Sequence, residues 1–221
     1  MIDHPWDISS AEAVAIQKRL AGRVRRVRLR WPVRTVAGVD CAFVAGGREI
    51  ITVAVLCDAQ SWGVLATATD RRACTFPYVP GLLSFREAPS VIAAIRALPR
   101  RPDLVMCDGQ GVAHPRGLGL ASHVGLCAGV PTIGVAKSRL CGRHGEVGRG
   151  RGCRVALRLR GRVIGSVVRT RSGVKPLFVS VGHRVTLAEA VAWVLRAAPN
   201  VRLPEPTRQA HRLVSELKSR G

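Results

Sequence analysis

The sequence predicts an α/β fold in which a central mixed sheet is flanked by helices. Short apolar runs with the length of buried strands alternate with longer runs that have helical spacing. The hydrophobic fraction is 47% and the aromatic fraction only 4%, so we expect a core packed mainly with aliphatic side chains. The 221 residues contain no low-complexity linker, and a single domain spanning 1–221 is therefore expected.

The first half of the chain is predicted to begin with a helix and to continue as a meander of strands. Ser9 and Glu12 have the spacing of a capping box, which places the start of the first helix there. Three β-like runs follow, at 35–45, 50–56 and 62–67. Gly46-Gly47 predicts a tight hairpin turn between the first two. Pro89 is expected at the first position of the next helix.

The second half continues with alternating strands and helices. We expect strands at 104–107 and 132–136 around a helix at 119–127, basic strands at 154–160 and 163–169, a strand segment at 178–180, a helix at 187–197 and a last helix from 206 or 207. A three-stranded meander followed by helix, strand, helix and strand is the element order of the ribonuclease H-like fold. The predicted fold class is therefore ribonuclease H-like.

The charge balance points to a polyanionic partner. Lys and Arg number 35 against 14 Asp and Glu, a formal net charge of +21. Nucleic acid would gain from counterion release at each neutralised phosphate. An anionic membrane would favour a basic amphipathic helix, which the sequence lacks, and a general bias toward Arg remains an alternative. Six arginines form a basic strip whose function could be phosphate contact or only solvation: Arg23, Arg25, Arg26, Arg28, Arg30 and Arg34.

The cysteines indicate a reducing compartment. There are seven, an odd number, and no Cys-x-x-Cys pair occurs, which argues against disulfides and against a structural zinc site. The first residues contain acids and no apolar core of a secretory signal. Ser122, Gly129 and Pro131 interrupt the uncharged stretch 118–136, so we do not interpret it as a membrane span. A cytoplasmic location is expected.

Three acidic residues stand in unusual settings. Asp40 lies in an apolar strand, where a buried carboxylate needs a metal ion or a salt bridge to an arginine. Asp108 follows a buried strand and precedes glycines that leave it accessible, although Asp-Gly is also a common turn. Glu87 precedes the helix predicted at Pro89 and could merely favour that helix start. Together the three acids predict a divalent-metal site suited to phosphodiester hydrolysis.

Further residues are candidates for the same chemistry. Lys137, after the strand at 132–136, could steer a phosphate or be a surface lysine. His211, near the start of the last helix, could return to the acids as a ligand or proton carrier. Tyr78 lies between Pro77 and Pro80 in a rigid loop, where it could wedge between bases or pack in a turn.

The sequence resembles the endonuclease V family of deoxyinosine-directed DNA repair nucleases over nearly its whole length. The motifs that carry the resemblance are Val36-Ala37-Gly38-Val39-Asp40, Phe76 to Glu87, Asp108 to Arg116, Ala121-Ser122-His123, Ile133 to Leu140, Gly182-His183 and Leu203 to His211. The resemblance implies a ribonuclease H-like fold. It also implies Mg²⁺-dependent cleavage of the second phosphodiester 3′ to a deaminated base, which leaves 3′-hydroxyl and 5′-phosphate ends.

The resemblance also assigns roles to particular residues. The catalytic acids and metal ligands would be Asp40, Glu87 and Asp108, with His211 completing the site. Tyr78 matches the wedge aromatic, and the positions that would enclose a flipped hypoxanthine are Gly81, Leu83 and Gly109. His114 and Lys137 match residues close to the scissile phosphate. The segment 142–154 departs from the family pattern, which affects the expected DNA footprint but not the chemistry.

The implied partner is single- or double-stranded DNA that contains deaminated bases. The protein is expected to act as a monomer and not to bind a membrane. Mg²⁺ is the expected cofactor, and whether Mn²⁺ can replace it is left open. An inosine-specific endoribonuclease is one alternative function, and a non-catalytic basic nucleic-acid-binding protein is another. The intact set of Asp40, Glu87 and Asp108 argues against the second alternative.

Overall fold

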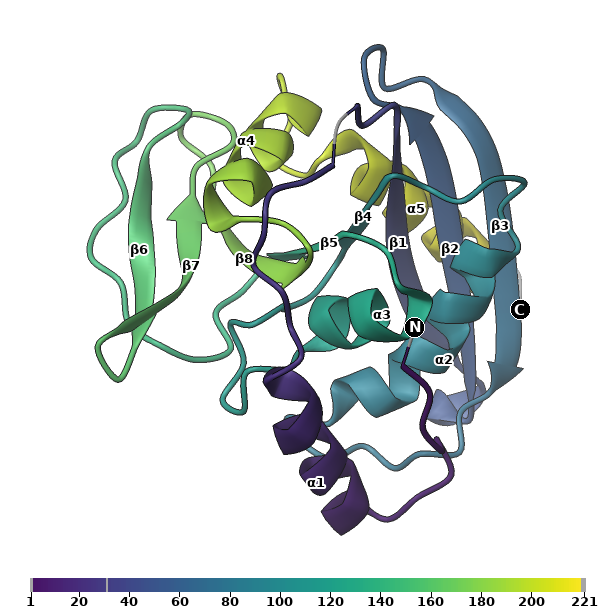
Figure 1. Cartoon of the computed structure of the whole chain (residues 1–221). Helices are drawn as coiled ribbons and strands as arrows, with labels where there is room; N and C mark the ends of the chain where they lie inside the picture. The colour runs from purple at the N-terminus through teal and green to yellow at the C-terminus, as the bar shows by residue number, and fades with distance from the viewer. Residues whose placement is uncertain (1, 31, 220–221) are drawn as a thin grey trace.

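The computed structural model describes residues 2–30 and 32–219 and contains one mixed eight-stranded sheet (Figure 1). Its strands are β1 (Thr35–Val44), β2 (Glu49–Asp58), β3 (Val64–Ala73), β4 (Leu104–Cys107), β5 (Thr132–Ala136), β6 (Arg154–Leu159), β7 (Arg162–Val168) and β8 (Leu177–His183). The spatial order is β3-β2-β1-β4-β5-β8-β7-β6. The β1–β4 and β4–β5 pairs are parallel and the other pairs are antiparallel. This arrangement confirms the expected mixed sheet and the ribonuclease H-like fold.

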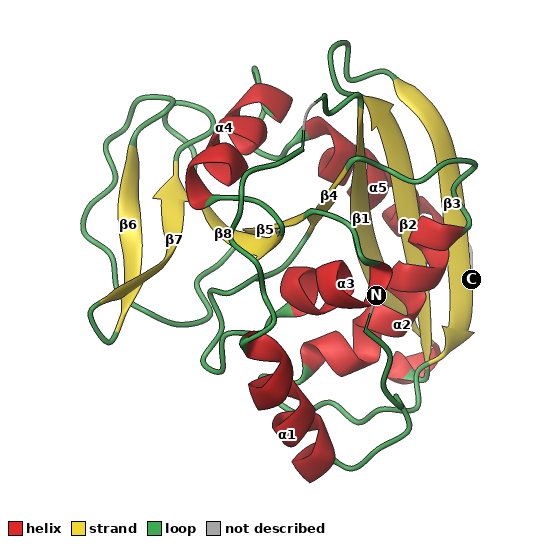
Figure 2. Ribbon diagram, in the orientation of Figure 1, coloured by secondary structure: helices red, strands yellow, loops and turns green. Residues whose placement is uncertain are grey.

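Helices cover both faces of the sheet (Figure 2). They are α1 (Ser10–Ala21), α2 (Leu83–Arg96), α3 (Leu120–Ala128), α4 (Leu187–Ala197) and α5 (Glu205–Ser219), with a short 3-10 turn at Ala45–Gly47. Successive residues of β2 point to opposite faces of the sheet. Leu56 packs with α2 and α3, whereas Val55 packs with α5. A third core joins α4 to β5 and β8, and α1 packs outside α2 and α3.

The predicted start of the second helix is wrong. Pro89 lies inside α2, which already begins at Leu83. The residue before the helix, Leu82, provides no side-chain cap, so the sequence carries no polar start signal there. Burial of Phe85 and Ala88, which are 2% and 0% exposed, holds the first turns and offsets the hydrogen bond that proline cannot donate.

A buried chain of hydrogen bonds ties the N-terminal segment to α3 and α2. Nε2 of His4 lies 2.7 Å from Nε2 of His123, and Nδ1 of His123 lies 3.1 Å from the Ser84 hydroxyl. Nδ1 of His4 donates to the Pro5 carbonyl at 2.8 Å, because a carbonyl only accepts. Neutral His123 then donates to His4 and accepts from Ser84. Burial lowers the pKa of His123 to about 3, which keeps the His123 ring uncharged.

The structure describes all seven cysteines and the uncharged stretch 118–136. All seven cysteines are free thiols, and burial raises the pKa of Cys127 to about 11. Cys127 lies with His4 and His123, with ligand atoms all within 4.8 Å of one another, although no Cys-x-x-Cys motif marks the group. Within 2–30 and 32–219, no helix is long and apolar enough to cross a membrane.

Close packing at Gly38 sets the position of α5. A Cβ atom on Gly38 would lie 2.1 Å from the backbone carbon of Pro206 and 2.4 Å from the nitrogen of Thr207. Only a residue without a side chain lets the first turn of α5 touch β1 so closely. Asp40 is two residues further along β1 and therefore faces the same side of the sheet, toward α5.

We expect Gly38→Ala to lower the free energy of unfolding by about 1–3 kcal/mol, because the new methyl group overlaps the backbone of α5. Denaturant unfolding measures this change. The control is Gly145→Ala, whose added Cβ atom would meet nothing within 4 Å. Equal unfolding midpoints for the two variants would contradict the packing argument.

Candidate active site

Parallel pairing of β1 and β4 places two carboxylates side by side. Val39 and Cys107 are register partners, and the N–H of Asp108 donates to the Val39 carbonyl at 3.3 Å. The residues that follow this pair are both aspartates, Asp40 on β1 and Asp108 directly after β4. The sheet brings together two acids that are far apart in the sequence.

Two basic side chains from other elements contact these carboxylates. Nδ1 of His211, on α5, lies 2.6 Å from Oδ2 of Asp40. Nζ of Lys137, directly after β5, lies 2.5 Å from Oδ2 of Asp108 and 3.5 Å from Nδ1 of His211. The structure places His211 beside Asp40 and Lys137 beside Asp108, and the roles expected for both residues stay predictions.

Glu87 approaches the two aspartates from α2. Its side chain is buried, and burial together with the charges of Asp40 and Asp108 raises its pKa to about 8. Burial and the charge of Asp40 also raise the pKa of Asp108, while Lys137 acts in the opposite direction. Three carboxylates thus share a poorly solvated region in which their charges repel one another.

The donor set of this centre fits a divalent cation. Oxygen atoms of Asp40 and Asp108 and a ring nitrogen of His211 all lie within 4.8 Å of one another. Carboxylate oxygens are the ligands that Mg²⁺ prefers, and a cation would relieve the repulsion that raises the pKa of Glu87.

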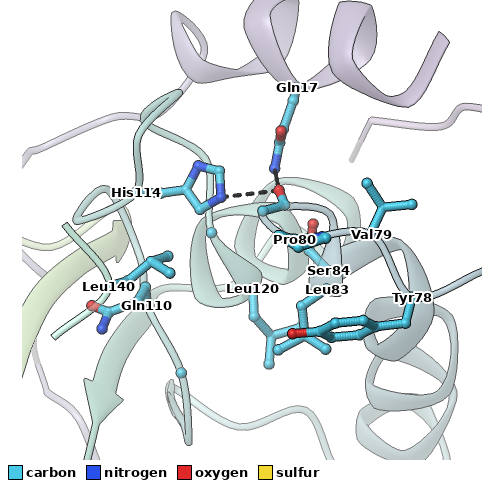
Figure 3. A pocket seen from close by; sticks show the side chains of 13 residues that line it. Gln17, Tyr78, Val79, Pro80, Leu83, Ser84, Gln110, His114, Leu120 and Leu140 are labelled. Atoms are coloured by element: carbon cyan, nitrogen blue, oxygen red, sulfur yellow. Dashed lines mark hydrogen bonds between the residues drawn. The ribbon is translucent and has the colours of Figure 1, made fainter. Parts of the chain in front are cut away.

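A mostly apolar pocket adjoins the acidic centre (Figure 3). Its volume is about 180 Å³. Five residues singled out in the sequence line it: Tyr78, Gly81, Leu83, Gly109 and His114. Gly109 follows Asp108 directly, so the pocket and the acids are neighbours. Tyr78 is 72% exposed at the pocket, which excludes the alternative of a tyrosine buried in a turn.

Three side chains converge on one backbone carbonyl in the pocket wall. The oxygen of Gly81 accepts a hydrogen bond from Nε2 of Gln17 at 3.0 Å, and Nε2 of His114 lies 3.0 Å away (Figure 3). It also accepts a hydrogen bond from the Arg116 guanidinium at 2.7 Å. Arg116 also donates to the Gln17 amide oxygen. Gly81 has φ +80°, which favours glycine. These contacts fix the peptide group between Tyr78 and α2.

His114 belongs to the pocket rather than to the acidic centre. Its ring is buried, and burial together with the nearby Arg116 charge lowers its pKa to about 4. A neutral His114 can donate through Nε2 to the Gly81 carbonyl and accept the Arg116 N–H at Nδ1, 3.2 Å away. Its expected position close to the scissile phosphate stays a prediction.

Sequence reasoning missed the pocket residues that come from α1 and from neighbouring loops. Gln17 is fully buried on the packed face of α1, where its polar side chain interrupts an apolar pattern. That interruption was the available signal. Ser84, Gln110, Leu120 and Leu140 also line the pocket, and their local sequence gave no such signal.

Comparisons with known proteins agree with this geometry. The family model described as Endonuclease V matches residues 18–212. Endonuclease V of Azotobacter vinelandii is 52% identical over 211 residues, which are 95% of each chain. The crystal structure of Endonuclease V from Streptomyces avermitilis has a TM-score of 0.92 at 45% identity and covers 99% of this chain and 97% of that one.

Some of the similar solved structures contain nucleic acid. One of them is Ciona intestinalis Endonuclease V in complex with a 24-mer DNA containing an inosine followed by a ribo-adenosine. It has a TM-score of 0.81 and 24% identity and covers 96% of this chain and 98% of that one, so the likeness concerns the fold. The match of the family model over most of the chain, together with the close curated relative, shows that this protein belongs to the endonuclease V family of nucleases.

Proposed function

We propose that this protein is a Mg²⁺-dependent endonuclease that nicks DNA at the second phosphodiester 3′ to deoxyinosine and other deaminated bases. The observation that carries the proposal is the direct connection, through Asp108 and Gly109, of a carboxylate centre to a pocket that can hold a base. Family membership supports nuclease chemistry. The inosine in the DNA bound by the Ciona intestinalis relative supports the choice of lesion.

In this proposal the acidic side chains hold the metal, and the neighbouring basic side chains interact with the negative charges of the site. Asp40, Asp108 and Glu87 would bind Mg²⁺, with His211 completing the site. When bound, the ion would activate water and neutralise phosphate charge. Lys137, already paired with Asp108, would attract the scissile phosphate. Hydrolysis breaks the bond between phosphorus and the 3′ oxygen, which gives the 3′-hydroxyl and 5′-phosphate ends.

The pocket would select the base through fixed peptide groups. Hypoxanthine carries a carbonyl where adenine carries an amino group, so a rigid donor can favour one over the other. The three donors on the Gly81 carbonyl would keep the peptide group between Gly81 and Leu82, close to Leu83, from reorienting. Tyr78 would fill the space that the extruded nucleotide leaves in the duplex.

The remaining parts of the proposal concern the state of the protein. We propose a single domain that acts as a monomer in the cytoplasm, with Mg²⁺ as its natural metal. The free thiols of all seven cysteines are compatible with a reducing compartment.

Asp108→Asn is expected to lower lesion-dependent nicking by at least about 100-fold, because it removes a charge from the metal centre at nearly constant shape. The assay is cleavage of a labelled duplex with one deoxyinosine in Mg²⁺, beside an undamaged duplex and a substrate with inosine in RNA. Asp7→Asn, at an exposed site, is the control. Unchanged nicking by Asp108→Asn would refute the proposed metal role, and cleavage of the RNA alone would assign the endoribonuclease alternative.

Glu87→Gln should change how stability depends on pH in protein kept metal-free by a chelator. The pKa of Glu87 is raised from 4.5 to about 8, so its contribution to stability is complete below pH 4.5 and is lost as pH rises toward 8. The expected slope from this group is up to about 1.4 kcal/mol per pH unit, and the variant should lack it. Denaturant unfolding between pH 5 and 9 measures the slope.

The matched control for Glu87→Gln is Glu146→Gln, because Glu146 is exposed. This control should keep the wild-type dependence on pH. Added Mg²⁺ should stabilise the wild type more than Glu87→Gln, because the wild type offers one more carboxylate to the ion. Parallel stability curves for the wild type and Glu87→Gln would show that Glu87 does not titrate as its surroundings imply.

Tyr78→Ala should weaken binding of inosine-containing duplex by about 5- to 100-fold, which corresponds to the loss of one aromatic stacking contact. Metal binding should not change, because Tyr78 lines the pocket and is not part of the acidic centre. Leu65→Ala, at a residue that is 53% exposed on β3, is the control. An equal loss on lesion and undamaged duplexes, together with weaker metal binding, would exclude the wedge role.

A further inference from the structure

A groove lined by five arginines lies outside the candidate active site. We call it the arginine groove and define it by Arg25, Arg28, Arg30, Arg101 and Arg184. Three of them come from the extended segment between α1 and β1, and the others precede β4 and follow β8. All five are exposed. The groove therefore combines distant segments into one cationic surface.

The groove is held in a defined shape by backbone contacts. The carbonyl of Gly129, at the end of α3, accepts hydrogen bonds from Arg101 at 2.5 Å and from Arg184 at 3.0 Å. The N–H of Arg184 donates to the carbonyl of Arg25 at 2.7 Å, which fastens the segment after α1 to the end of β8. A guanidinium has five N–H donors, so Arg101 and Arg184 keep donors for a ligand.

One acidic residue, Asp103, also lines the groove, and Asp103 and the nearby Glu189 already accept hydrogen bonds from other groups. Oδ2 of Asp103 accepts the N–H of Arg34 at 2.9 Å and both the N–H and the hydroxyl of Thr35, at 2.9 and 3.0 Å. Glu189, whose pKa Arg28 helps to lower, accepts from Leu29 and caps α4. Across 2–30 and 32–219, none of the five groove arginines forms an ion pair with a carboxylate.

The groove and the acidic centre lie at opposite ends of the parallel strands. Arg101 precedes β4, whereas Asp108 follows it. Four residues of a strand separate the two edges by about 13 Å, at about 3.3 Å per residue. In Figure 1 the segment after α1 crosses from α1, past β8, toward the start of β1. A nucleic acid bound at the acids would reach the groove only if the same strand continued around the protein. Otherwise a second segment of nucleic acid would have to bind there.

We propose that the arginine groove binds the phosphodiester backbone of a second stretch of nucleic acid, independently of any lesion. Guanidinium groups match phosphate oxygens in pairs, and several of them on one concave surface suit a chain of phosphates. Val27, 50% exposed and among the lining residues, gives an apolar contact for a sugar or base. The inference extends beyond the proposed nuclease function and does not require cleavage.

The proposal divides the basic strip that the sequence left open. Arg25, Arg28 and Arg30 line the groove, whereas Arg23, Arg26 and Arg34 do not. The first three would contact phosphate, and the other three would be solvated. Each of the two interpretations of the strip would therefore apply to half of its arginines.

The test compares two variants that each lose three positive charges. Arg25→Gln/Arg28→Gln/Arg30→Gln alters the groove, and Arg160→Gln/Arg162→Gln/Arg171→Gln alters exposed positions elsewhere. Affinity for an undamaged 40-base-pair duplex is measured against salt concentration. The slope of log affinity against log salt should fall by about 2 to 3 for the groove variant, since each lost phosphate contact accounts for about 0.9. The control should change it by less than one.

A second measurement locates the bound strand directly. A photo-crosslinking phenylalanine derivative at position 27 should link to the duplex under ultraviolet light, and the same group at position 65 on β3 should not. The groove variant should still nick a 12-base-pair inosine duplex within about twofold of wild type, because that duplex occupies only the acidic centre.

Several outcomes would overturn the inference. Two of them are equal salt slopes for both variants and the absence of a crosslink at position 27. A third is that the groove variant loses nicking of the short duplex as strongly as it loses affinity for the long one, which would make the groove part of the cleavage site. Displacement of the crosslink by polyglutamate at equal charge concentration would also overturn it and indicate an acidic protein partner. Because the salt-dependence and crosslinking measurements use an undamaged duplex, a failure of the nuclease proposal leaves both of them intact.

Discussion

Repulsion between neighbouring carboxylates is the constraint to which the rest of the site responds. Asp40 and Asp108 end up side by side because β1 and β4 pair in parallel, and Glu87 is buried against both. Lys137 and His211 contact the two aspartates and reduce their repulsion. Burial and the charges of Asp40 and Asp108 still raise the pKa of Glu87, so a cation bound among the three carboxylates would be stabilising.

The scaffold reaches this arrangement by covering both faces of the sheet. α2 brings Glu87 from one face, and α5 brings His211 from the other. The contact between Gly38 and the first turn of α5 places His211 over Asp40. Separate elements therefore converge on the carboxyl ends of the parallel strands, which is where open α/β sheets place their sites.

Charge is distributed unevenly over the molecule. Several acids pair with arginines on their own or adjacent elements, including Glu49 with Arg71, Asp70 with Arg72 and Glu205 with Arg208. Asp40 and Asp108 instead lie side by side, and their basic partners, His211 and Lys137, come from other elements. The arginine groove at the opposite edge has no such pairing among the described residues. The two edges thus differ in how their charged side chains are paired.

The sequence by itself determined the elements and the identity of the acids. Apolar periodicity located the strands and most helices, and the capping box at Ser9 and Glu12 is present as predicted. Capping and periodicity act between residues a few positions apart, so a sequence displays them directly. The start of α2 escaped prediction because Leu82 is not a polar cap and tertiary burial of Phe85 holds the first turn.

Only the tertiary structure decided which distant groups meet. The register of β1 against β4 pairs Asp40 with Asp108, the crossing of α1 brings Gln17 to the Gly81 carbonyl, and the end of α3 joins Arg101 to Arg184. The family resemblance anticipated the first of these contacts but not the other two. Such contacts depend on strand order and helix packing, which are set by the burial of the whole core and leave no mark in the local spacing of residues.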